Sequence, residues 1–165
     1  MNRRGFTLVE LLGVIIILAI VLVIVIPNVL ENLNKGKEGS YDILLDNIIT
    51  ASISLYEECE YNSSVYNNDS DLSCPPRDNS ITITLQKLVD YGFLSGSSYI
   101  EQQTTGKKLL NPKTEEDIGD CEVTINKSCN SNYVCDYTVT SKETVLEDAT
   151  CPSEEELKMV REKRS

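Results

Sequence analysis

The sequence contains no histidine and no tryptophan, and only two phenylalanines among its 165 residues. Without histidine the chain cannot build a Ser-His-Asp triad, and metal sites with imidazole ligands are excluded as well. It also lacks a G-x-S-x-G nucleophile motif and a phosphate-binding glycine loop. We therefore expect a protein that is not an enzyme and binds no cofactor, with carboxylate-only catalysis as the remaining enzymatic alternative.

Positive charge is scarce, because 15 Lys and Arg residues stand against 26 Asp and Glu and give a formal net charge of −11. Loss of residues 1–5, which contain Arg3 and Arg4, would leave 13 basic residues and a net charge of −13. Such a chain repels nucleic-acid phosphates, so direct nucleic-acid binding is not expected. Only the stretches 106–108 and 162–165 are candidates for a local basic patch.

Cysteine is missing from the first 58 residues, and all six cysteines follow: Cys59, Cys74, Cys121, Cys129, Cys135 and Cys151. An even number of cysteines after an apolar segment predicts up to three disulfides in an oxidising compartment. Zinc is the competing interpretation, but no C-x-x-C pair and no histidine is present to supply the usual ligands. We therefore expect an exported, disulfide-linked domain without a bound metal.

Charge is nearly absent between Phe6 and Ile26, where Glu10 is the only charged residue among 21. As a helix this run would span about 30 Å, the thickness of the hydrocarbon core of a membrane. No A-x-A-like cleavage site follows it, so we expect the segment to stay attached. Basic residues on both sides do not decide its orientation, but the cysteines place the residues after it outside. These features predict a single-pass protein of the cytoplasmic membrane.

The stretch RRGFTLVE at residues 3–10 resembles the class III leader of type IV pilins and pseudopilins. The resemblance rests on Gly5, Phe6 and Glu10 in register, on the short basic leader, and on Pro27 at the expected distance into the apolar run. It implies that a prepilin peptidase cleaves between Gly5 and Phe6 and that Phe6 becomes N-methylated. It also implies that Glu10 pairs with the terminal amine of an adjacent subunit during assembly. The alternative is a plain signal anchor in which Glu10 reaches the inner headgroups.

The same resemblance implies a function and its partners. The chain would be a structural subunit that stacks through its apolar helix, with copies of itself and other pilins, into a cell-surface or periplasm-spanning filament. A prepilin peptidase, a membrane assembly platform and an assembly ATPase would be its partners. Adhesion or motility, DNA uptake and secretion all remain open uses of such a filament. The alternative is a signal-anchored extracellular binding protein or enzyme that does not polymerise.

Hydrophobic periodicity changes after Pro27, where 3–4 spacing marks an amphipathic stripe formed by Tyr41, Leu44, Leu45, Ile48, Ile49, Ser52, Leu55 and Tyr56. The proline either bends one long helix, as the resemblance implies, or ends its first part. The expected fold is α+β and type IV pilin-like, with the long helix packed on a small antiparallel sheet stapled by disulfides. The expected domains are a leader (1–5), a transmembrane and assembly helix (6–27), an amphipathic half-helix (28–58), an extracellular domain (59–152) and a helical tail (153–165).

Two further helices are predicted after the long one. Residues 84–94 favour a short helix with Thr84 as its N-cap and Gly92 as its C-terminal stop. The tail begins with Ser153 and Glu156, which form an S-x-x-E capping box.

A β-hairpin is predicted between these helices, because residues 121–125 and 133–140 alternate apolar and polar side chains around a turn. One face of each strand carries a cysteine, so the two could meet across the hairpin. The resulting hypothesis has three bridges: Cys59–Cys74, Cys121–Cys135 and Cys129–Cys151. Six cysteines allow fifteen pairings, which leaves this connectivity open.

The turn-rich link at 109–120 contains Glu115, Glu116, Asp117 and Asp120. Major secretion pseudopilins hold calcium in a comparable loop, so the resemblance raises calcium binding at 111–120 as one interpretation. The spacing does not fit an EF-hand, and a solvated acidic loop is the favoured alternative.

Overall fold

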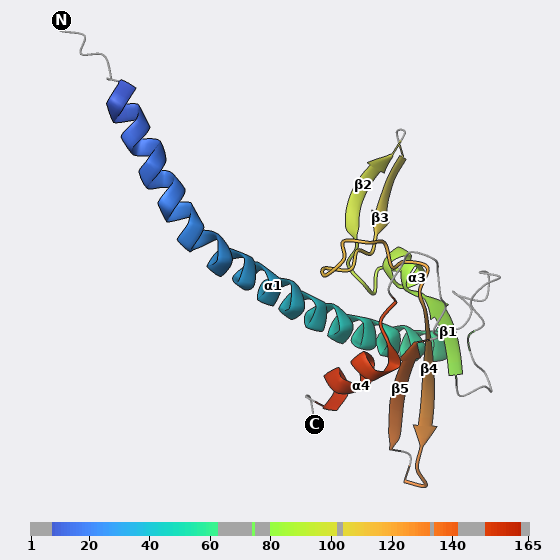
Figure 1. The fold of residues 1–165 in the computed structure, drawn as a ribbon. Helices are drawn as coiled ribbons and strands as arrows, with labels where there is room; N and C mark the ends of the chain where they lie inside the picture. The colour runs from blue at the N-terminus through green and yellow to red at the C-terminus, as the bar shows by residue number, and fades with distance from the viewer. Residues whose placement is uncertain are drawn as a thin grey trace, which may run out of the picture. The chain divides into compact units, whose positions relative to one another are not determined.

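The computed structural model describes residues 8–62, 74, 80–101, 104–132, 134–141 and 151–162. The chain divides into an N-terminal unit, residues 1–39, and a C-terminal unit, residues 40–165. Helix α1 (Leu8–Tyr61) contributes to both units (Figure 1).

In the N-terminal unit, α1 continues through Pro27. A proline inside a helix lacks a backbone N–H, so the carbonyl of Val23, four residues earlier, loses its helical donor. The helix nevertheless continues on both sides of Pro27, and at the next residue the side-chain Nδ2 of Asn28 donates to the carbonyl of Ile24 at 3.4 Å. The prediction of one continuing helix is therefore confirmed, and the alternative of a helix that ends at Pro27 is wrong.

Among the described residues of the C-terminal unit, α1 is followed by five strands and two helices: β1 (Ser80–Thr84), α3 (Leu85–Asp90), β2 (Ser97–Glu101), β3 (Thr104–Lys108), β4 (Glu122–Cys129), β5 (Cys135–Ser141) and α4 (Glu154–Glu162). Strands β1, β4 and β5 form an antiparallel sheet in the order β1-β4-β5. Strands β2 and β3 form a separate antiparallel ribbon (Figure 1). The expected α+β fold, a long helix on a small antiparallel sheet, is confirmed.

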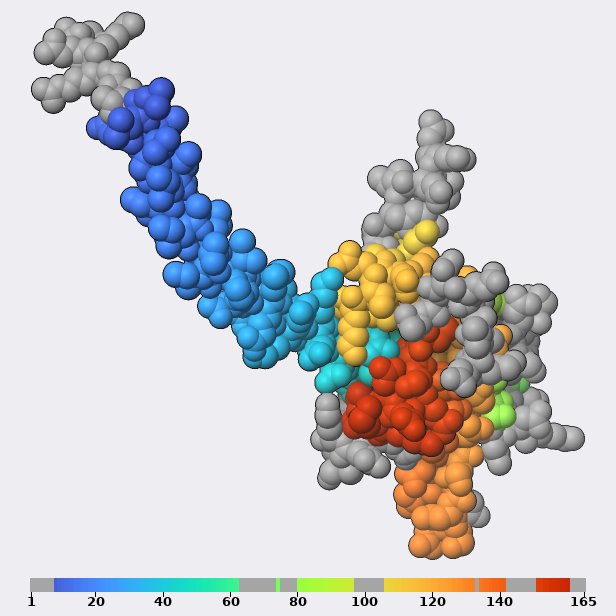
Figure 2. Space-filling model, in the orientation of Figure 1, coloured from blue at the N-terminus to red at the C-terminus, as the bar shows by residue number. Residues whose placement is uncertain are grey.

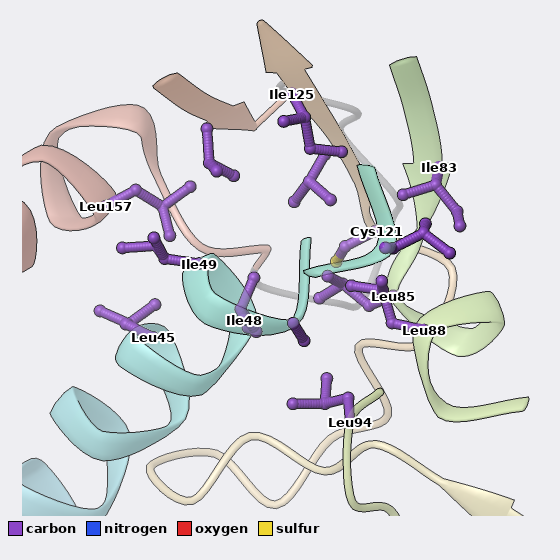
Figure 3. Packing of buried hydrophobic residues seen from close by; sticks show 14 of the residues in the cluster. Leu45, Ile48, Ile49, Ile83, Leu85, Leu88, Leu94, Cys121, Ile125 and Leu157 are labelled. Atoms are coloured by element: carbon purple, nitrogen blue, oxygen red, sulfur yellow. The ribbon is translucent and has the colours of Figure 1, made fainter. Parts of the chain in front are cut away.

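The core of this unit lies between the second half of α1 and one face of the three-stranded sheet (Figure 3). Residues of the predicted stripe are buried there, and Ile48 and Leu55 have no exposed surface. Ile81 faces Ile125 across the β1–β4 pair, and Ile125 faces Val139 across the β4–β5 pair, so apolar side chains line one face of the sheet. The amphipathic stripe of α1 is therefore the surface by which the helix packs on this sheet.

The short helix α3 begins and ends where its capping residues predict. The backbone N–H of Lys87 donates to Thr84 Oγ1 at 3.4 Å, as expected for an N-cap. Gly92 has φ +83°, a conformation that glycine adopts without strain and that turns the chain out of the helix. The regular helix covers six residues, and the rest of the predicted 84–94 segment forms the turn that follows.

The tail helix α4 has the predicted capping box. The backbone N–H of Ser153 donates to Glu156 Oε2 at 2.9 Å, and the backbone N–H of Glu156 donates to Ser153 Oγ at 3.3 Å. Two backbone donors that the first turn would leave unpaired are satisfied in this way.

Candidate functional site

The first half of α1 carries the largest apolar surface of the described chain. No side chain between Leu8 and Gly39 is buried. The large apolar side chains from Leu8 to Leu33 keep between 45% and 80% of their surface exposed. Among the residues that the structure describes, α1 is the one helix long and apolar enough to cross a membrane. Monomeric soluble proteins rarely expose contiguous apolar surface of this size, which makes this half of α1 a candidate for burial in lipid or against other apolar helices.

Glu10 is the acidic residue at the start of this surface. It lies in the first turn of α1 and is exposed. A carboxylate at this position is favoured by the partial positive charge at the N-terminal end of a helix. Gly5 and Phe6, the predicted cleavage and methylation positions, lie outside the described residues, and their roles stay predictions.

The C-terminal unit contains three disulfides: Cys59–Cys74, Cys121–Cys151 and Cys129–Cys135. The predicted Cys59–Cys74 bridge is present, and it ties the end of α1 to a residue 15 positions later. The bridge from Cys121 to Cys151 fastens the segment just before α4 to the segment just before β4.

The other two predicted pairings, Cys121 with Cys135 and Cys129 with Cys151, are wrong. The register of the hairpin places Cys129 directly opposite Cys135, with a Cα–Cα distance of 3.9 Å. Cys121 precedes β4 and lies beyond the last pair of the hairpin, which joins Val123 to Ser141. Because β4 extends to Cys129 rather than ending near Ile125, the cysteine expected in the turn belongs to the strand.

Tyr41 connects three segments of the C-terminal unit that are distant in sequence. Its hydroxyl donates to Glu156 Oε2 at 3.1 Å, and the Lys113 Nζ lies 4.0 Å from its ring centroid. Burial raises the pKa of the Tyr41 phenol, and the charge of Glu156 raises it further. Since 115 positions separate Tyr41 from Glu156, no local sequence signal could have revealed this contact.

A second polar cluster joins the end of α1 to the sheet. The Tyr56 and Tyr137 rings meet edge to face at 5.6 Å, and Lys127 Nζ lies 5.8 Å from each ring centroid. Lys127 Nζ also donates to both carboxylate oxygens of Glu60, at 2.9 and 2.7 Å. This hydrogen bonding raises the pKa of Lys127. Because 67 positions separate Glu60 from Lys127, no local sequence pattern indicates this contact.

In the acidic link, residues 109–120, the Asp117 side chain contacts nearby groups of the chain itself. Asp117 Oδ1 accepts a hydrogen bond from the backbone N–H of Gly119 at 3.0 Å, and Asp117 Oδ2 lies 3.8 Å from Lys108 Nζ. Within the described ranges, no three His, Cys, Asp or Glu side chains are grouped so that they could hold a metal ion. The arrangement of these residues therefore does not support the calcium interpretation.

Comparisons with known proteins bear on the N-terminal segment. Residues 1–26 match the model of a family described as "Prokaryotic N-terminal methylation motif". These residues contain the leader, Glu10 and the apolar run that α1 exposes. The N-terminal segment is therefore similar to the methylation motif of this prokaryotic family.

Two curated proteins are similar to this chain over 61 aligned positions. One is the "ComG operon protein 3 homolog" of Bacillus licheniformis, at 41% identity over 34% of this chain and 58% of its own length. The other is the "Competence protein ComGC" of Bacillus subtilis, at 43% identity over 34% of this chain and 57% of its own length. The chain thus covers less than two thirds of either relative. No solved structure matches the chain.

Proposed function

We propose that this chain is a structural, non-catalytic subunit of a type IV pilus-like filament. A prepilin peptidase removes residues 1–5, and Phe6 becomes the N-methylated terminus. Before assembly the protein spans the cytoplasmic membrane with its C-terminal unit outside. The observation that carries the proposal is the apolar first half of α1, which buries no side chain and begins with a single acidic residue. Lipid covers this surface before assembly, and the helices of other subunits cover it afterwards.

Glu10 sets the register of the subunits in this proposal. An isolated carboxylate at the centre of a membrane costs roughly 2.5–3.5 kcal/mol on insertion scales. The cost falls when the carboxylate meets the positive terminal amine of Phe6 on a neighbouring subunit, because the two charges are then desolvated together. Each subunit supplies one acid and one amine, so the same contact repeats along a filament.

The names of the two relatives favour one use of the filament. Both belong to a ComG operon or are called competence proteins, so we propose competence rather than adhesion, motility or secretion. The net charge of −11 argues against direct capture of nucleic acid by this subunit, because like charges repel. A prepilin peptidase, an assembly platform, an assembly ATPase and other pilins remain its proposed partners.

The test begins with the intact mass and N-terminal sequence of the chain from its native membrane and from filaments sheared off the cell surface. We expect a monomethylated Phe6 as the first residue in both fractions. The variant Glu10→Gln should be cleaved normally but should stay in the membrane fraction, because its neutral side chain no longer pairs with the amine.

Glu31→Gln is the matched control. Glu31 lies on the same helix, is exposed, and pairs with Lys35 Nζ at 2.7 Å across one helical turn. An exposed pair of this kind contributes little, so this variant should enter filaments as the unmodified chain does. A chain that starts at Met1 and forms no filament would leave a plain signal-anchored protein. A Glu10→Gln variant that assembles normally would instead refute the pairing of Glu10 with the terminal amine.

A further inference from the structure

One edge of the three-stranded sheet is open in the described part of the chain. Strand β5 pairs with β4 on one side, and the sheet order β1-β4-β5 leaves its other side without a described strand. A cavity of about 300 Å³ runs along this side. Its walls are residues 135–140 of β5, Ile49 and Ile53 of α1, and Leu157 and Lys158 of α4. Figure 2 shows α4 in red beside the orange atoms of the β4–β5 hairpin.

The backbone along this edge is set up for strand pairing. Asn130 N donates to Val134 O at the end of the hairpin, so these two residues form a hydrogen-bonded pair. In an antiparallel ladder such pairs alternate with pairs whose backbone groups point outward. The register therefore directs the backbone N–H and C=O groups of Tyr137 and Val139 toward the cavity side of β5. An open row of this kind with an apolar floor is typical of sites that accept an added strand.

The chain also carries a strand that suits this edge. The β2–β3 ribbon is separate from the three-stranded sheet, and β2 pairs only with β3 among the described residues. On the β3 side, the carbonyl of Lys107 accepts a hydrogen bond from Gln86 Nε2 at 2.9 Å, which leaves β2 as the outer strand. An isolated two-stranded ribbon is marginally stable by itself in water. Pairing of β2 with another strand would extend its sheet.

The composition of the ribbon agrees with this pairing. The sequence of β2 contains two consecutive apolar residues, Tyr99 and Ile100, which suit a contact with an apolar surface. Residues 97–108 contain two lysines and one glutamate. Both lysines lie in β3 and the glutamate lies in β2. The ribbon as a whole is thus less acidic than the chain, whose net charge is −11, so another copy repels it less than it repels the rest of the surface.

The two elements do not meet within one chain. In Figure 1 the β2–β3 ribbon and the β4–β5 hairpin leave the C-terminal unit in opposite directions. We infer that β2 of one copy adds to the open edge of β5 in a neighbouring copy. Such a contact is heterologous, since it joins two different surfaces. Heterologous contacts form rings where the rotation closes and open filaments where it does not. The inference rests on the proposed function and adds a second subunit interface outside the apolar helix.

The experiment places a photo-crosslinking amino acid at Thr138 on β5 in the full chain. The same amino acid at Thr82 on β1, the opposite edge of the sheet, is the control; both side chains are exposed. Irradiated filaments should give a band of twice the subunit mass on a reducing gel for position 138 only. Mass spectrometry should find the link to residues 97–101. The variant Tyr99→Lys/Ile100→Lys should lose this band, whereas Thr82→Lys should keep it.

Each outcome decides a different point. Filaments whose position 138 links within its own chain, or to another segment of a neighbour, would overturn this inference and leave the proposed function intact. Correctly processed protein that forms no filament and no doubled band would overturn both. Peptide mapping without reduction should show all three native disulfides in each variant, so a lost band then reports a lost contact rather than a misfolded subunit.

Discussion

Removal of the Cys121–Cys151 bridge tests the architecture of the C-terminal unit directly. This bridge closes a loop of 30 residues, whereas Cys129–Cys135 closes a loop of 6. The entropy of closing such loops in the unfolded chain gives a stabilisation of about 3.6 kcal/mol for the longer loop and about 2.2 kcal/mol for the shorter. Cys121 is also 1% exposed, so its replacement by alanine leaves a buried site less well packed. Cys121→Ala/Cys151→Ala should therefore destabilise the unit more than Cys129→Ala/Cys135→Ala.

Urea unfolding of the full chain in detergent, followed by tyrosine fluorescence without reductant, measures both double variants. We expect the free energy of unfolding to fall by about 1.4 kcal/mol more for the first variant than for the second, which is the difference between the two loop-closure terms. Cys151 precedes α4 by three residues, so limited proteolysis should also cut near residues 154–162 in the first variant alone. Equal losses in the two variants, or a larger loss in the second, would refute the loop argument. Peptides that join Cys121 to Cys135 would refute the connectivity.

Two further substitutions test the buried polar groups. Ser52 is fully buried, and its Oγ has no hydrogen-bond partner in the described part of the chain. Ser52→Ala should therefore raise the free energy of unfolding by up to about 1 kcal/mol in the same urea assay. A loss of that size would show that the hydroxyl has a hydrogen-bond partner. Tyr41→Phe should lower it by about 1.5–3 kcal/mol at pH 8, since a hydrogen bond to a charged carboxylate is lost. Because burial raises the pKa of Tyr41 above its ordinary value of 10.0, the unfolded chain ionises first as pH rises. The contribution of Tyr41 is complete below about pH 10 and declines above it, so stability should fall less steeply with pH in Tyr41→Phe.

The parts of the fold that the sequence predicted are those decided by local chemistry. Thr84 and Ser153 cap helices because their side-chain oxygens reach backbone N–H groups within the next three residues. The amphipathic stripe of α1 was visible because helical periodicity depends only on spacing along the chain. The apolar run with Glu10 was likewise readable residue by residue.

The parts that were missed depend on which segments meet. The sequence SITIT of β1 alternates apolar and polar residues, as a strand should. Its neighbour β4 follows almost forty residues later, so nothing local in the sequence indicated the strand with which β1 pairs. The strands β2 and β3 have no such alternation and were not predicted. The disulfide pairing failed for the same reason, because hairpin register decides which cysteines face each other and the predicted strand stopped at 125. The contacts of Tyr41 with Glu156 and of Lys127 with Glu60 could not be predicted without the tertiary structure.

The positions of these long-range contacts suit a subunit that is held by one end. The second half of α1 is tied near its start, where Tyr41 binds Glu156, and at its end, where Glu60 binds Lys127 and Cys59 is bridged to Cys74. Apolar contacts with the sheet lie between these ties. In the proposed filament the first half of α1 is fixed among other subunits, so a pull on the C-terminal unit passes through the second half. If only apolar contacts held the helix to the sheet, a pulling force would break them one after another, starting at the end where the force acts. Directional bonds and a covalent bridge at the two ends oppose that peeling, because the helix cannot leave the sheet without breaking one of them first.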